Sequence, residues 1–214
     1  NIGRALRYER PEIVEQGVAT PATGWTLAFP TELEALDIAT GLPNPAKAER
    51  ARRNPKIGLL IEGRPDEPVV VIRAHAAVRD RDIQSNAIRY LAETGYKGIS
   101  HGITWEQARL AVTYWSRIII ENAPERIYWW ANRAALDGPP QVWNADPATV
   151  WPESDPAPAG RMNPSAWPVR DWRIVAGDAV KSGNACHLSV LDGDGFPVPM
   201  RAHAFDVVGD GFRL

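Results

Sequence analysis

The sequence has one cysteine, no long apolar run and almost no net charge. Cys186 cannot form a disulfide within the chain, and we interpret it as a small core residue and not a nucleophile. No apolar stretch approaches the roughly 20 residues of a membrane-spanning helix, so no membrane contact is expected. The net charge of −2 gives no basic field for nucleic acid. No export signal opens the sequence, which favours a cytoplasmic setting.

The common motifs of catalytic sites are also lacking. No HExxH pair, paired CxxC or glycine pattern of a nucleotide loop occurs, so we predict no metal site and leave the catalytic residues unassigned. Four separate histidines could each meet a ligand, but an isolated histidine is more often structural. They are His75, His101, His187 and His203. The acidic and glycine residues at 192–195 favour a hairpin turn over a calcium loop.

The composition is that of an ordinary soluble globular protein, with 44% apolar and 23% charged residues. Its unusual count is tryptophan, with nine residues spread from Trp25 to Trp172. Because large aromatic side chains bury much apolar area wherever they lie, we interpret them as packing residues and not as a surface for stacking bases or sugars.

Short runs of alternating polarity begin at residue 25. Residues 25–30 and 33–40 predict the two strands of a hairpin. The alanine-rich, basic stretch 46–54 predicts a short helix that ends before Pro55, because the residue ahead of a proline disfavours helical geometry. Residues 56–62 and 69–80 predict two further strands, of which the second is β-branched and central.

Helical spacing of apolar residues follows that central strand. It predicts helices over 83–94 and 104–115, the second with Thr104 as N-cap, and a short helix near 10–16 is also expected. Residues 116–130 then predict two strands, joined by a turn at 122–124. Strands with helices laid outside them predict a mainly β, α+β fold.

Composition divides the chain into three parts. Residues 1–136 carry the predicted strands and helices, and 137–168 are rich in proline and predict a surface loop or linker. Residues 169–214 predict a C-terminal β segment with a strand, a turn at 192–195, a second strand and a third strand after a further turn.

The order of these elements resembles one known superfamily, and the likeness covers about half of the chain. The stretches that carry it are NPAKAERARRNPKIGLLI, VVVIRAHAAVRDRD and IIIENAPERIYWW. They are similar to corresponding stretches of the pyridoxamine 5'-phosphate oxidase-like FMN-binding split-barrel superfamily. The resemblance implies a split β-barrel with flanking helices over residues 1–136, and a C-terminal segment that is part of a second barrel copy or completes the first.

The same resemblance implies a flavin site. Thr40 and Lys47 would hold the phosphate, where a strand end meets a helix N-terminus. The backbone of the segments Trp25–Leu27 and Asp37–Ala39 would line the ring. Three residues of the closing strands, Arg126, Trp129 and Trp130, would shape the site. The residues expected at the cofactor are therefore Trp25, Thr26, Leu27, Asp37, Ala39, Thr40, Lys47 and Trp130.

The implied activity is that of an FMN-dependent oxidoreductase for a small organic substrate, in a homodimer. A deazaflavin-dependent reductase is one alternative, and a barrel that binds haem or flavin without turnover is another. The chain departs from the superfamily in two places. The first strand that members usually have ahead of the hairpin is not recognisable in residues 17–24, and Pro45 and Ala46 stand where members often have serine and arginine. A hydroxyl and a guanidinium are therefore missing from the expected phosphate site, so either phosphate binding is weaker or another group compensates.

Overall fold

The computed structural model describes residues 18–19, 26–27, 36–42, 46–94, 106, 115–158, 171–183 and 186–213. The chain divides into two compact units, residues 1–158 and 159–214. In the described residues no helix is long and apolar enough to cross a lipid bilayer. The described part of the chain is mainly β, with helices α3, α4 and α7 and the 3-10 helix η2.

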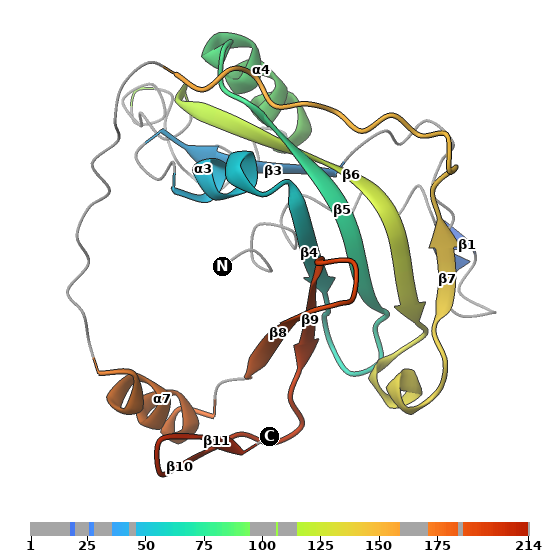
Figure 1. Ribbon diagram of the computed structural model, residues 1–214, viewed down its shortest axis with the longest axis vertical. Helices are drawn as coiled ribbons and strands as arrows, with labels where there is room; N and C mark the ends of the chain where they lie inside the picture. The colour runs from blue at the N-terminus through green and yellow to red at the C-terminus, as the bar shows by residue number, and fades with distance from the viewer. Residues whose placement is uncertain are drawn as a thin grey trace. The chain divides into compact units, whose positions relative to one another are not determined.

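The first unit is built around a curled antiparallel sheet with the form of a half-barrel (Figure 1). Its strand order is β3-β6-β5-β4, and β7 also pairs with β6. The strands are β3 (Leu36–Gly41), β4 (Lys56–Ile61), β5 (Val69–Arg79), β6 (Arg117–Trp130) and β7 (Gln141–Asn144). As predicted, β5 is a central strand, and most of its residues are buried on both faces of the sheet.

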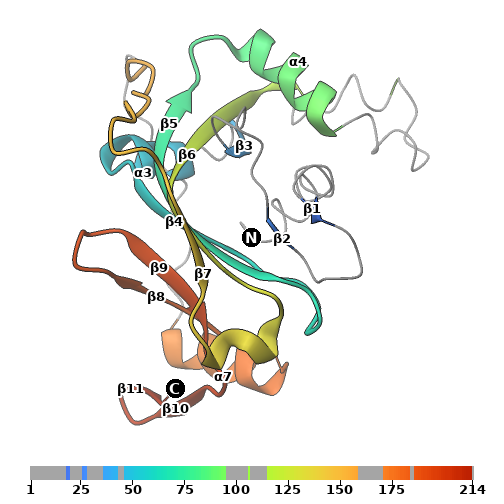
Figure 2. The same ribbon diagram turned by 90° about the vertical axis from the view of Figure 1, so that its right-hand side faces the viewer.

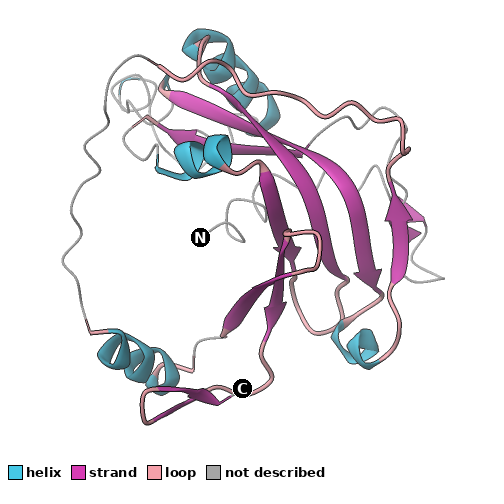
Figure 3. Cartoon of the chain, in the orientation of Figure 1, coloured by secondary structure: helices cyan, strands magenta, loops and turns pink. Residues whose placement is uncertain are grey.

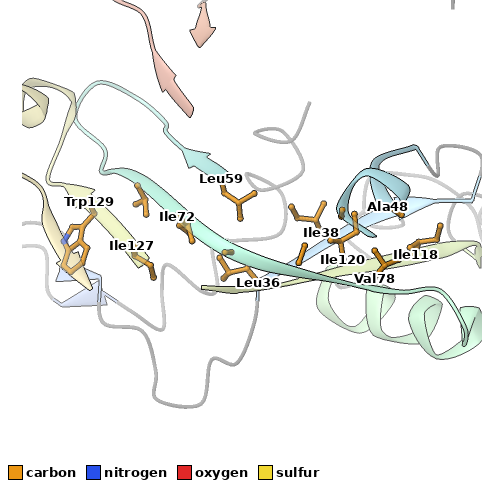
Figure 4. Close-up of a cluster of buried hydrophobic side chains, with 14 residues drawn as sticks. Leu36, Ile38, Ala48, Leu59, Ile72, Val78, Ile118, Ile120, Ile127 and Trp129 are labelled. Carbon is orange, nitrogen blue, oxygen red and sulfur yellow. The ribbon is translucent and has the colours of Figure 1, made fainter. Parts of the chain in front are cut away.

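Alternation along the strands separates an apolar inner face from a polar outer face. On β5, for example, Ile72 faces inward and its neighbour Arg73 faces outward. The inner face forms the core, and Figure 4 shows its side chains gathered on one side of the sheet. The strand residues of this core are Leu36, Ile38, Leu59, Val70, Ile72, Ala74, Ala76, Val78, Ile118, Ile120, Ile127 and Trp129.

Two helices cover opposite faces of this sheet (Figure 4). Helix α3 (Ala46–Arg53) buries Ala48 and Ala51 against the inner face, and it ends before Pro55 as predicted. Helix α4 (Ile83–Thr94) lies on the outer face, where the Asn86 side chain bonds the backbone of β5 and β6. The short helix near 10–16 lies outside the described residues, as does the helix expected at 104–115 apart from two of its positions.

Strand β6 corrects the prediction of two strands joined by a turn at 122–124. It is one continuous strand with a bulge at Glu125, opposite the step from Arg73 to Ala74 in β5. On its other edge β6 pairs with β3 up to Asn122 and with β7 only from Arg126. Pro124 lies between these partners, where a ladder needs no N–H, so the proline does not end the strand.

Strand β3 also pairs differently from the prediction. Strand β2 (Thr26–Leu27) pairs with β1 (Val18–Ala19), whereas β3 pairs with β6, so residues 25–30 and 33–40 do not form one hairpin in the described part of the chain. The partners are distant in sequence, which local periodicity cannot reveal.

Residues 137–158, expected to be loop or linker, lie within the first unit. The 3-10 helix η2 (Arg133–Asp137) leads into β7, and the chain then runs back along β5. Val78 N donates to Ser154 Oγ at 3.0 Å, and Asp155 N donates to Val78 O at 2.8 Å. Because β4 pairs with β5 only as far as His75, residues 154–155 protect the part of the β5 edge that β4 leaves uncovered.

The described residues of the second unit form a helix and two hairpins, which Figure 3 distinguishes by colour. They are α7 (Trp172–Lys181), the pair β8 (His187–Leu191) and β9 (Pro197–Arg201), and the pair β10 (Asp206–Val208) and β11 (Gly211–Arg213). The expected turn at 192–195 joins β8 to β9. The expected second strand ends at Arg201, so His203 lies in a loop and not in a strand.

Candidate functional site

The expected phosphate residues lie at the end of β3, where the chain leaves the sheet for α3. Thr40 faces the inner side and is buried, and Gly41 ends the strand. Leu42 N then donates to Ser116 O at 3.0 Å. Lys47 is the second residue of α3 and half-buried, and no described carboxylate forms an ion pair with it. A strand end followed by a basic helix is therefore present where the sequence placed it.

The residues expected to line the ring are divided between the two faces of the sheet. Asp37 and Ala39 alternate with Ile38 and Thr40, so their side chains lie on the outer face, opposite Thr40. Of the early segment, Thr26 and Leu27 form β2, and Trp25 lies outside the described residues. One face therefore cannot present all the side chains of the expected set.

Trp130 lies at the far end of β6 from the expected phosphate site. Thr40 pairs with Ile118, and at about 3.3 Å per residue the strand from there to Trp130 is on the order of 40 Å long. Trp130 Nε1 donates to Gly138 O at 2.9 Å. Arg126 Nε donates to Asn144 Oδ1 at 2.7 Å, so this arginine too is held beside β7. The structure does not bring Arg126 or Trp130 to the end of β3.

An ion-pair network covers the outer face between β3 and α4. Glu121 accepts from Arg79 Nε at 2.7 Å and from Arg89 Nη1 at 2.8 Å, and Arg89 Nη2 lies 2.5 Å from Asp37 Oδ2. Burial raises the pKa of Glu121, but the hydrogen bonds and charges of Arg89 and Arg79 outweigh it, so the pKa is lower than usual. This network fixes α4 on the sheet.

Asp155 extends the network at the end of β5. Its Oδ2 accepts from the backbone N–H groups of Asp80 and Arg81 at 3.0 Å each. Burial raises its pKa, but these N–H groups and Arg79 lower it by more, so the carboxylate form is favoured. Arg52 of α3 bonds both the Asp80 carboxylate, at 2.5 Å, and the backbone oxygen of Asp155. These contacts are structural, since they join α3, β5 and residues 151–155.

His75 belongs to a second polar cluster on the outer face. The bulged residue Glu125 accepts from Arg73 Nη2 at 3.0 Å and lies 2.7 Å from His75 Nε2 through its other oxygen. The His75 ring stacks on Trp151 with 4.1 Å between centroids and 16° between planes. A carboxylate on one side and an indole on the other fix the imidazole plane. Both contacts favour the structural interpretation of His75.

Sequence reasoning missed Glu125 and Trp151. Glu125 follows a proline, which suggested a turn, while its position in the bulge depends on where β3 and β7 end against β6. Trp151 lies in the proline-rich stretch that predicted a loop. One feature of the sequence could have indicated the role of Glu125: it lies between apolar strand residues. A charged residue in such a position predicts an oppositely charged partner nearby.

The remaining candidates do not assemble a site. His187 is exposed on β8, Cys186 is half-buried before that strand, and His101 lies outside the described residues. In the 192–195 turn, Asp192 Oδ1 accepts from the N–H groups of Asp194 and Phe196, as a hairpin turn requires. Over the described ranges, no group of three or more histidine, cysteine or acidic side chains is arranged to hold a metal.

Comparison with protein-family models, with curated proteins and with solved structures found no match to this chain.

Proposed function

We propose that this protein binds FMN at the end of β3 and acts as an oxidoreductase on a small organic substrate, as a member of the split-barrel superfamily. The observation that carries the proposal is the junction of β3 and α3. There a strand of the curled sheet ends at Gly41, and a basic helix starts at Ala46. The superfamily that the sequence resembles is expected to have this order of elements around the flavin phosphate. The finer description of the sheet as a split barrel belongs to the same proposal.

The residues at this junction fit a phosphate group. Lys47 lies in the first turn of α3, so its ammonium group and the helix N-terminus both favour an anion there. No carboxylate of the described residues neutralises Lys47. Glu49, the acidic residue of that turn, pairs with Arg52 at 3.6 Å. Lys47 is therefore available to a ligand.

The flavin, when bound, supplies the electron chemistry, and the chain supplies binding and orientation. In the described part of the sheet, β3 pairs on one side only, with β6. The backbone from Asp37 to Ala39 is therefore at an edge, where a flat ring can contact it. The absence of an assigned catalytic residue is compatible with this chemistry, because flavin reactions demand few acid or base groups from the protein.

The partner and location are part of the same proposal. The protein would be a homodimer in which a second subunit completes the flavin site, and it would be cytoplasmic. The C-terminal unit would be part of a second barrel copy or would complete the first barrel. A deazaflavin reductase would use the same junction. Haem or flavin bound without turnover is the non-enzymatic alternative, and the absorbance spectrum of the purified protein distinguishes flavin from haem.

The test is a titration of the full chain with FMN, followed by quenching of flavin fluorescence. Lys47→Ala should weaken FMN binding about ten-fold or more, because a hydrogen bond to a charged group contributes about 1.5 to 3 kcal/mol. The matched control is Arg53→Ala, which removes a positive charge from the exposed end of the same helix. A wild-type protein that binds neither FMN nor a deazaflavin would contradict the proposal. Equal losses in both variants would remove Lys47 from the site.

A further inference from the structure

Arg117, the first residue of β6, is buried without an acidic partner among the described residues. It is 9% exposed, and its Nε is fully buried with no hydrogen-bond partner. Within the described ranges no carboxylate forms an ion pair with it. The contact that its guanidinium makes is with an aromatic ring, since its carbon lies 3.9 Å from the centre of the Tyr90 ring. Burying a charge costs free energy unless an opposite charge is paired with it. A bound anion would therefore stabilise Arg117.

Three other buried or half-buried arginines of this unit show what is missing. Arg73 lies 3.0 Å from Glu125, and Arg79 lies 2.7 Å from Glu121. Arg52, whose side chain is 11% exposed, lies 2.5 Å from Asp80. Carboxylates of the same unit therefore neutralise these three guanidinium groups, whereas no described carboxylate neutralises Arg117.

The surroundings of Arg117 hold the guanidinium in place. The Tyr90 ring lies against the guanidinium group, whose N–H donors lie in the guanidinium plane. Asn86 Nδ2 donates to the backbone oxygen of Arg117 at 3.1 Å, which fixes the strand to α4. A planar group positioned in this way can donate two parallel hydrogen bonds to one anion, which is the geometry that phosphate prefers.

Arg117 lies at the same end of the sheet as the proposed phosphate site, which lacks a guanidinium at position 46. In the sheet register it is directly opposite Gly41, the last residue of β3, whose neighbour Leu42 bonds Ser116 O at 3.0 Å. In Figures 1 and 2, the end of β3 and the beginning of β6 can be followed to the same end of the sheet, near α3. Pro45 and Ala46 occupy the positions from which related sequences supply serine and arginine.

We propose that Arg117 binds the phosphate group of the ligand held at the end of β3, in place of the arginine missing at position 46. The identity of the ligand as a flavin rests on the proposed function, while the binding of a phosphate anion by Arg117 does not. Arg117 lies on the outer face of the sheet and Lys47 on the inner side, so a phosphate that contacts both would lie beyond the ends of β3 and β6.

The first experiment measures the thermal unfolding midpoint of the full chain in inorganic phosphate and in chloride of equal ionic strength. Phosphate should raise the midpoint of the wild type and should not raise that of Arg117→Gln. The matched control is Arg81→Gln, which removes an exposed positive charge just beyond β5 and should keep the phosphate response. In chloride, Arg117→Gln should unfold at the wild-type temperature or above, because it removes an unpaired buried charge.

A purely structural role for Arg117 gives the opposite pattern, with a lower midpoint in chloride and no response to phosphate in any variant. If Arg117→Gln does not fold, Arg117→Lys keeps the charge but not the paired donors, and it should show a reduced phosphate response. A wild type that phosphate does not stabilise, or an Arg117 variant that responds as the wild type does, overturns the inference.

The second experiment compares the dissociation constants of FMN and riboflavin, which differ by the phosphate. The wild type should favour FMN about ten- to hundred-fold, and Arg117→Gln should reduce that ratio towards one. Flavin binding with equal affinity for both would refute the role of Arg117 while leaving the flavin proposal intact. A response to phosphate that depends on Arg117, without any flavin binding, would refute the flavin proposal and leave Arg117 as an anion site.

Discussion

Replacing Glu125 by glutamine should destabilise the first unit, because its carboxylate neutralises a buried arginine. The Arg73 side chain is 5% exposed, and its Nη2 lies 3.0 Å from Glu125 Oε1. Removing one partner of a buried ion pair costs about 3 to 5 kcal/mol, since the other charge stays out of water. Glu125 is itself 26% exposed, so water recovers part of this cost. We expect the free energy of unfolding to fall by about 2 kcal/mol.

An exposed ion pair of nearly equal length gives the control. Arg64 Nε lies 2.9 Å from Glu67 Oε1, but the Arg64 side chain is 76% exposed. Exposed pairs contribute about 1 kcal/mol or less, so Glu67→Gln should have a much smaller effect than Glu125→Gln. Urea denaturation followed by tryptophan fluorescence measures both variants. The difference between them isolates burial, since the distances are alike.

A double-mutant cycle separates the ion pair from other contacts of Glu125. Arg73→Met removes the buried charge and keeps a side chain of similar length, so the double variant should lose less stability than the sum of the single variants. The coupling free energy should reach about 1 kcal/mol or more. A loss below about 0.5 kcal/mol for Glu125→Gln, or no coupling to Arg73, would refute the argument that burial makes this pair important.

Two further predictions concern acid stability and a hairpin turn. Because the pKa of Glu121 is lower in the folded chain, its contribution to stability is complete above the unfolded value of about 4.3 and is lost as pH falls through the folded value. Glu121→Gln should therefore flatten the fall of the unfolding free energy below about pH 4 in urea denaturation, and an unchanged slope would contradict this. Gly195 has φ of 80°, so Gly195→Ala should destabilise the β8–β9 hairpin by about 1 kcal/mol, whereas Gly193→Ala should cost less. Hydrogen exchange of the hairpin amides measures both, and equal exchange in the two variants would disprove the strain at Gly195.

Local chemistry was enough to predict several elements and one junction. The helix α3 ends before Pro55 because a proline restricts the residue ahead of it, and the β-branched run of β5 forms a central strand. The turn at 192–195 forms because Asp192 accepts from the backbone two and four residues later. The end of β3 lies near the basic helix that carries Lys47 because the helix follows the strand closely in the sequence.

Prediction failed where a residue's role depends on distant partners. Pro124 suggested a turn, but it lies between the ends of β3 and β7 on one edge of β6, where a strand tolerates a proline. Residues 154–155 bond the edge of β5 because β4 leaves it uncovered, which the proline-rich composition of that stretch cannot indicate.

The sequence by itself determined the apolar strands, the two faces of each strand and the position of a basic helix after β3, because these follow from spacing along the chain. Only the tertiary structure decided which charges meet. Glu125 is paired with Arg73, while Arg117 is buried beside Tyr90 without a described carboxylate. The sequence contains all of these residues, but the environment of each charge depends on strand register. Register brings together positions that lie far apart in the chain.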